Sequence, residues 1–121
     1  NSSNMNKIII IGASGQIGSE LTMELRRKFG HDNVIASDIK QASGDIMNSG
    51  PFEILDVMDE KRVYEVIKQH GIKKVYLLAA LLSGTSEKNP KFAWDLNMKS
   101  LLSVLEMAKD GVIEQIFWPS S

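Results

Sequence analysis

The clearest pattern in the chain is an unbroken apolar run that leads directly into glycines. Four isoleucines, Ile8–Ile11, are followed by glycines at positions 12, 15 and 18. A parallel strand that is buried on both faces reads as such a continuous run. After the glycines, apolar residues recur every four positions and predict a helix with one apolar stripe, made of Ile17, Leu21, Leu25 and Phe29. Residues 7–29 therefore predict a buried strand, a glycine-rich turn and an amphipathic helix.

Further short apolar runs predict that strands recur along the rest of the chain. The expected strands lie at residues 33–38, 52–57, 73–82 and 114–121, the last broken by Pro119. Residues 40–51 are rich in Ser, Gly and Asn and read as a surface loop.

Helices are predicted between these strands. Asp59 can cap one of them, Gly71 can end it, and its apolar face would consist of Val63, Val66, Ile67 and His70. A longer helix is expected over residues 90–109, because Asn89 and Pro90 form a typical start and Gly111 a typical end.

Strands that alternate with helices across short loops predict a parallel sheet with right-handed crossovers and helices on both faces. The expected fold class is α/β, a doubly wound Rossmann-type sheet with the strand order 3-2-1-4-5. A chain of 121 residues can form one domain with its own core. We expect residues 1–4 to be a tag or a disordered tail. Residues 5–121 would then form the domain, which stops before the last strands of a complete sheet.

The glycine-rich turn and the second strand together predict a dinucleotide site. A turn of this kind opens a helix whose backbone N–H groups and dipole attract a pyrophosphate. Asp38 ends the second strand, 20 residues after Gly18, where a carboxylate binds the adenosine ribose in such folds. Its charge would repel a 2′-phosphate, so we favour NAD over NADP, although nearby Lys40 leaves NADP open.

Composition narrows the class of ligand. The chain has 14 basic and 15 acidic side chains and no basic cluster, which argues against nucleic acid and membrane surfaces as partners. It has no cysteine, and its two histidines, His31 and His70, are too isolated for a metal site. No apolar run is long enough to span a bilayer and no signal sequence is recognisable, so we expect a cytoplasmic protein with a small-molecule ligand.

With these residues placed, residues 5–121 resemble the extended branch of the short-chain dehydrogenase/reductase superfamily, and within it the NAD-dependent L-threonine 3-dehydrogenases. The resemblance is carried by GASGQIGSEL at 12–21, VIASDI at 34–39, LDV at 55–57, LLAALLS at 77–83, DLNM at 95–98 and WPSS at 118–121. One departure is Leu77, where relatives often have His. It affects the closer likeness and leaves the cofactor site intact.

The resemblance implies a cofactor site spread over the carboxyl ends of several strands. The implied residues are Gly12, Gly15, Gln16, Ile17 and Gly18 at the pyrophosphate, Asp38 and Ile39 at the ribose, Asp56 and Val57 at the adenine, Leu78, Ala79 and Ala80 towards the nicotinamide, and Asn97 on buried backbone near the active site. Simpler interpretations stay open for some of them. Asp56 can be a turn former, the two alanines can be ordinary strand packing, and a mid-helix Asn usually faces water.

The resemblance also implies a catalytic tyrosine, a lysine four residues later and a substrate-orienting serine. Ser121 would be that serine, with Ser120 beside it, and Ser83 would contact the amino-acid end of the substrate; each can instead be a solvent-facing loop serine. Tyr64 and Lys68 have the YxxxK spacing. They precede the serine strand, whereas the family's pair follows it, so we do not assign them. We therefore expect this chain to be an inactive fragment that lacks the catalytic pair.

Three functions compete. The first is the NAD-binding portion of an L-threonine 3-dehydrogenase, which oxidises L-threonine to 2-amino-3-oxobutanoate. The second is a UDP-sugar epimerase or dehydratase of the same branch, and the third is a non-catalytic dinucleotide-binding module. Apolar residues surround most of the helix at 90–109, which predicts a homodimer through this helix in the full-length protein; a further part of the same protein could cover it instead, and burial in a larger core is an equal alternative.

Overall fold

A five-stranded parallel sheet forms the centre of the computed structural model, which describes residues 7–78, 99 and 102–117. The strands are β1 (Lys7–Ile11), β2 (Val34–Asp38), β3 (Phe52–Ile54), β4 (Ile72–Leu77) and β5 (Gln115–Phe117). They lie in the order β3-β2-β1-β4-β5, and every neighbouring pair is parallel. The predicted fold class and strand order are confirmed.

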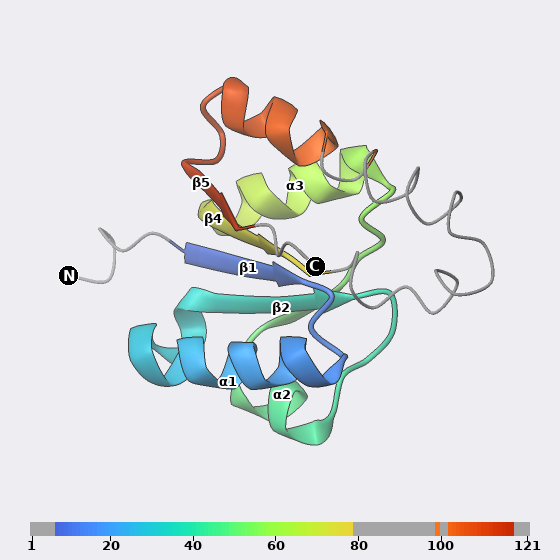
Figure 1. Ribbon diagram of the computed structural model, residues 1–121. Helices are drawn as coiled ribbons and strands as arrows, with labels where there is room; N and C mark the ends of the chain where they lie inside the picture. The colour runs from blue at the N-terminus through green and yellow to red at the C-terminus, as the bar shows by residue number, and fades with distance from the viewer. Residues whose placement is uncertain (1–6, 79–98, 100–101, 118–121) are drawn as a thin grey trace.

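Helices cover both faces of the sheet (Figure 1). On one face lie α1 (Gln16–Phe29) and the short α2 (Gly44–Ser49), and on the other lie α3 (Glu60–His70) and the helical residues 102–109. A single 3-10 turn, η2 (His31–Asn33), connects α1 to β2. The isoleucines of β1 alternate between two cores: Ile8 and Ile10 pack on the α1 side, whereas Ile9 and Ile11 pack on the α3 side. This two-sided burial explains why β1 reads as a continuous apolar run.

The buried face of α1 differs from the predicted stripe. Ile17 is 56% exposed, whereas the polar residues Thr22 and Arg26 are fully buried beside Leu25. Gly18 is buried against the turn before the helix, where an added Cβ would lie 2.4 Å from the carbonyl oxygen of Gly12. The helix is thereby rotated so that Ile17 faces outwards. Thr22 Oγ1 satisfies itself within the helix by donating to the carbonyl oxygen of Gly18 at 2.7 Å.

Residues 40–51 form more than the predicted loop, because they contain α2, whose Ile46 is fully buried. Arg26 holds this segment in place. Its guanidinium donates to the carbonyl oxygens of Val34, Ile46 and Pro51 and to Ser49 Oγ, at 2.6 to 3.1 Å. Burial lowers the pKa of Arg26 by desolvation, and these four acceptors compensate for the water that the guanidinium has lost.

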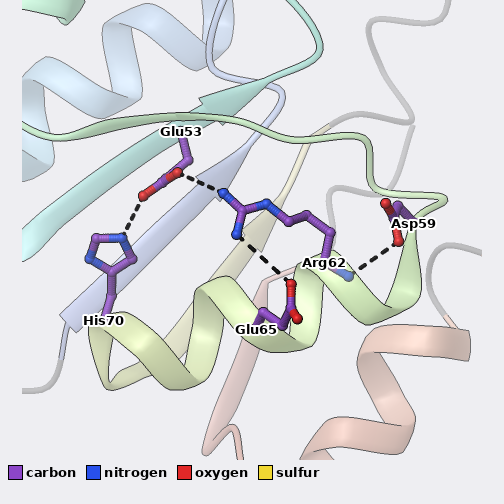
Figure 2. A network of polar contacts seen from close by, with 5 residues as sticks. All are labelled: Glu53, Asp59, Arg62, Glu65 and His70. Atoms are coloured by element: carbon purple, nitrogen blue, oxygen red, sulfur yellow. Dashed lines mark hydrogen bonds and ion pairs between the residues drawn. The ribbon is translucent and has the colours of Figure 1, made fainter.

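The predicted ends of α3 are confirmed. Asp59 accepts a hydrogen bond from the backbone N–H of Arg62 at 3.2 Å, and Gly71 closes the helix in the left-handed conformation, at φ 67° and ψ 37°. The predicted apolar residues Val63, Val66 and Ile67 are buried. Polar contacts then attach α3 to the edge strand β3, as Figure 2 shows.

Glu53 of β3 is the centre of that attachment. Its carboxylate lies 3.2 Å from Arg62 Nη2 and 2.8 Å from His70 Nε2, and Arg62 also lies 4.0 Å from Glu65 (Figure 2). His70, which was predicted on the apolar face, therefore binds a carboxylate at the edge of that face.

The last helix ends as predicted, since helical residues stop at Lys109 and Gly111 has a φ of 81°. Its predicted start at residues 89 and 90 lies outside the described residues. Val104 and Met107 are buried in the core, whereas Leu102 and Leu105 are 56% and 44% exposed. Across the residues that the structure describes, every helix is too short or too polar to cross a bilayer.

Candidate cofactor site

The glycine-rich turn lies at the carboxyl ends of the central strands. β1 has β2 on one side and β4 on the other, and Ile11, its last residue, is in register with Ser37 and Leu77. The chain passes through α1 to reach β2 and through α3 to reach β4, on opposite faces of the sheet. Such a point, where the strand order reverses, is where parallel α/β sheets bind their ligands.

The turn is attached to the end of β2 by its own backbone. Gly12 has a φ of 101°, which favours glycine. The N–H groups of Gly12 and Ala13 both donate to the carbonyl oxygen of Ser37, at 2.8 and 2.9 Å. These bonds hold the start of the turn against β2, so that the following residues lead into α1 at a defined position.

The N-terminus of α1 fits an anionic ligand. Gly15 is the N-cap residue and has no side chain to accept a hydrogen bond, and the first turn contains no acidic residue. The first N–H groups of a helix have no acceptor within the helix, and the helix dipole makes this end positive. Gln16 and Ile17 are exposed. Together these features leave the turn accessible to a pyrophosphate.

Gly18 allows the close packing that forms this turn. An added Cβ would meet the Gly12 carbonyl oxygen at 2.4 Å and Ala13 Cα at 2.8 Å, both of which are backbone atoms. A larger residue would therefore force α1 away from the end of β1. This is the role that the third glycine has in dinucleotide-binding turns.

Asp38 lies directly beside the turn, as predicted for a ribose-binding acid. Its Oδ2 accepts hydrogen bonds from the N–H of Ser14 at 3.0 Å and from Ser14 Oγ at 2.5 Å. Its Oδ1 accepts from the N–H of Ile39 at 2.6 Å. The structure thus brings together the glycine-rich turn and the acid at the end of β2. Ser14 and Asp38, which make this contact, are 24 residues apart in the sequence.

The residues implied for the adenine lie further along the same edge of the sheet. Ile39 is 68% exposed, and Asp56 is exposed while its Oδ1 accepts from the N–H of Met58 at 2.9 Å. This hydrogen bond forms a turn, as expected if Asp56 is a turn former, which was the simpler interpretation of this residue. Val57 packs partly against the core on the α3 side. Their roles towards the cofactor stay predictions.

Leu78 directly follows β4 and is the last described residue before residue 99. Its N–H donates to the carbonyl oxygen of Ile11 at 2.8 Å, and its side chain is 5% exposed. Six predicted site residues lie outside the described residues: Ala79, Ala80, Ser83, Asn97, Ser120 and Ser121. Tyr64 and Lys68 are both exposed on α3.

Sequence reasoning did not single out Ser14. The residue lies between the glycines of the GxxGxxG pattern, and its contact with Asp38 depends on the register between β1 and β2. The sequence signal that could have identified Ser14 is a hydroxyl side chain in such a turn together with an acid at the end of the next strand. Within the described part of the chain, no group of three or more histidine or acidic side chains could hold a metal ion.

A family model confirms the class of protein that this fold and site define. The model of the NAD dependent epimerase/dehydratase family matches residues 8–121. The chain therefore belongs to this family, and its cofactor is NAD. The turn at Gly12–Gly18, the uncapped start of α1 and Asp38 fit such a cofactor.

The chain is similar to a dehydrogenase and to an epimerase of known structure. An L-threonine dehydrogenase structure from Cupriavidus necator, in holo form, is 49% identical with a TM-score of 0.85, over 95% of this chain and 37% of that one. A UDP-glucose 4-epimerase structure from Stenotrophomonas maltophila, with NAD and formylated UDP-arabinopyranose bound, is 25% identical with a TM-score of 0.79, over 97% of this chain and 37% of that one. An uncharacterized epimerase/dehydratase from Staphylococcus saprophyticus is 49% identical over 97% of this chain. The chain spans 37% of the length of that relative.

Proposed function

We propose that the chain is the NAD-binding portion of an L-threonine 3-dehydrogenase, which oxidises L-threonine to 2-amino-3-oxobutanoate while NAD is reduced to NADH. The observation that carries the proposal is the uncapped, acid-free start of α1 beside Asp38. The choice of substrate is supported by the 49% identity to an L-threonine dehydrogenase, compared with 25% to a UDP-glucose 4-epimerase.

In this proposal the described residues bind and orient the cofactor. The N–H groups of Gly15–Gly18 donate to the pyrophosphate, Asp38 accepts from a ribose hydroxyl with Ile39 beside it, and Asp56 and Val57 border the adenine. Bound NAD supplies the acceptor for the hydride that leaves C3 of threonine. Leu78, Ala79 and Ala80 would line the cofactor towards its nicotinamide.

The substrate side of the site is proposed on sequence grounds. Ser121 would orient the β-hydroxyl of threonine, with Ser120 beside it, Ser83 would contact the amino-acid end, and Asn97 would bind backbone near the reacting centre. The family's tyrosine takes the hydroxyl proton, and its lysine lowers the pKa of that tyrosine. Both would follow Ser121 in chain order, so residues 1–121 would need them for turnover.

The test is a steady-state assay of the full-length protein with L-threonine and NAD. Formation of NADH that depends on L-threonine, together with no turnover by residues 1–121 alone, would agree with the proposal. A full-length protein that binds NAD but produces no NADH from L-threonine would rule out this substrate.

A UDP-sugar epimerase or dehydratase is the second candidate. The family is named for epimerases and dehydratases, and the structure from Stenotrophomonas maltophila that resembles this chain is a UDP-glucose 4-epimerase. An epimerase regenerates its cofactor, so the purified full-length protein would retain NAD and convert UDP-glucose without net NADH. A protein that binds NAD and has neither activity would instead support a non-catalytic dinucleotide-binding module.

We also propose that the full-length protein forms a homodimer through the helix predicted at 90–109. Leu102 and Leu105 are 56% and 44% exposed on its described part, and an apolar stripe of this kind favours burial in an interface. Replacing both with glutamate should convert a dimer to a monomer in sedimentation equilibrium. A monomer without the substitutions would contradict the proposal.

A further inference from the structure

The contact between Ser14 and Asp38 links the two halves of the proposed site through one side chain. Ser14 donates twice to the same carboxylate oxygen, from its backbone N–H at 3.0 Å and from Oγ at 2.5 Å. The preceding residues of the turn, Gly12 and Ala13, donate to the carbonyl oxygen of Ser37. Three consecutive residues of the turn are therefore attached to the last two residues of β2.

These contacts restrict how the Asp38 carboxylate can turn. A carboxylate has about four acceptor positions. Ser14 occupies two positions on Oδ2, and the N–H of Ile39 occupies one on Oδ1 at 2.6 Å. About one position remains for a ligand while all three bonds persist. The carboxylate is thus held in one orientation beside the turn before any nucleotide binds.

We propose that Ser14 is a positioning residue that acts through Asp38 and sets the preference of this site for NAD over NADP. The inference rests on the proposed binding of the adenosine ribose by Asp38. A carboxylate held beside the ribose accepts from one ribose hydroxyl at its remaining position and repels a 2′-phosphate. A carboxylate that can rotate away loses part of both effects, because the ribose bond weakens and the phosphate meets less negative charge.

Of the three donors to Asp38, the hydroxyl of Ser14 is the one that a substitution can remove. Ser14→Ala keeps the two backbone donors to Asp38 and removes only the bond from Oγ. Hydrogen bonds to charged groups are the stronger ones in proteins, so this loss should be measurable in binding. Ser14→Thr keeps a hydroxyl and should restore the orientation of Asp38.

Ser19, in the first turn of α1, provides a matched control because it also bonds to the glycine-rich turn. Its Oγ donates to the carbonyl oxygen of Ala13 at 3.0 Å and is not bonded to Asp38. Ser19→Ala therefore removes one serine hydroxyl bond from the turn without changing the contacts of the acid. It should change the affinities for NAD and NADP by the same factor and leave their ratio unchanged.

The experiment measures dissociation constants for NAD and NADP by titration calorimetry on the full-length protein. Ser14→Ala should raise the constant for NAD about tenfold, change that for NADP by less, and so reduce the discrimination. Ser14→Thr should return the ratio to within about twofold of the unsubstituted protein. In an Asp38→Asn background, Ser14→Ala should change the ratio by less than about twofold, because two residues that act through one contact are not additive.

Three results would overturn this role for Ser14. The first is unchanged discrimination in Ser14→Ala, and the second is tighter NAD binding, which would mean that the hydroxyl competes with the ribose for Asp38. The third is an equal effect of Ser14→Ala with and without Asp38→Asn. If the unsubstituted protein bound neither nucleotide, the proposed cofactor site itself would be wrong, and the role of Ser14 with it.

Discussion

The N-termini of α1 and α3 differ although both helices follow strands of the same parallel sheet. α1 begins after Gly15 with no capping side chain and no acid in its first turn. α3 begins after Asp59, which accepts from the N–H of Arg62, and it has Glu60 in its first turn. The C-terminal ends are more alike, since Gly30 and Gly71 cap them with positive φ angles of 103° and 67°.

The difference agrees with two different roles: we propose that the N-terminus of α1 binds a ligand, whereas the N-terminus of α3 stabilises its own helix. A capping Asp is worth about 1 kcal/mol to a helix, and an acid in the first turn adds to that. α3 uses both devices, and the N–H of Arg62 at its start has an acceptor within the protein. α1 uses neither, which agrees with the proposal that its first N–H groups bind a ligand, and residues such as Gly18, Leu25 and Arg26 bury it against the rest of the protein.

The largest effect should come from filling the space at Gly18. Gly18→Ala places a Cβ 2.4 Å from the Gly12 carbonyl oxygen and 2.8 Å from Ala13 Cα, and backbone atoms cannot move aside easily. The free energy of unfolding should fall by about 3 kcal/mol in urea titrations, and NAD binding should be lost. Gly44→Ala is the control, because its Cβ would have an ordinary contact of 3.6 Å with Asn48. Equal stability of the two variants would show that α1 does not need this close approach.

A second substitution would make the start of α1 resemble that of α3. Gly15 has φ −76° and ψ 173°, an extended conformation that Asp adopts readily at an N-cap. Gly15→Asp should keep or slightly raise thermal stability, yet weaken NAD binding by about 2 kcal/mol, because a carboxylate would face the pyrophosphate. Gly15→Asn caps the helix without the charge and should lose less affinity. An unchanged dissociation constant for NAD in Gly15→Asp would place the pyrophosphate elsewhere.

The parts of the fold that could be predicted from sequence depend on local patterns. Strand order, the two ends of α3 and the turn at Gly12–Gly18 follow from apolar runs, caps and glycines that lie close together in the chain. Asp38 was predicted because its position relative to the glycines is a property of the βαβ unit, and the structure places it beside the turn.

The parts that were missed depend on contacts between distant segments. Arg26 reads as a charged surface residue, and its burial becomes favourable only when Val34, Ile46 and Pro51 supply carbonyl oxygens. α2 was missed for the same reason, since a polar segment becomes helical when Ile46 and Arg26 anchor it. Ser14 likewise gains its role only after β1 and β2 pair in register.

A smaller effect is expected at the capped end of α3. Asp59→Ala removes the acceptor for the N–H of Arg62 and should lower the free energy of unfolding by about 1 kcal/mol. NAD affinity should not change, because this cap is satisfied within the protein and lies outside the proposed site. Asp59→Ser keeps an acceptor and should recover most of the stability. Weaker NAD binding in Asp59→Ala, at temperatures where the variant is fully folded, would mean that the two helix ends are not independent.

The smallest effect is expected where α3 is attached to the sheet edge, through the contacts of Glu53 with Arg62 and His70 (Figure 2). Arg62 is 40% exposed and Glu53 is 22% exposed, so solvent screens the pair, and Glu53→Gln should cost about 0.5 kcal/mol. The cost should shrink further in high salt, because the ion pairs are accessible to counterions. Unfolding in urea at low and high salt measures both quantities. A loss several times larger that does not depend on salt would mean that α3 is held at the edge by these contacts more than by Val63, Val66 and Ile67 in the core.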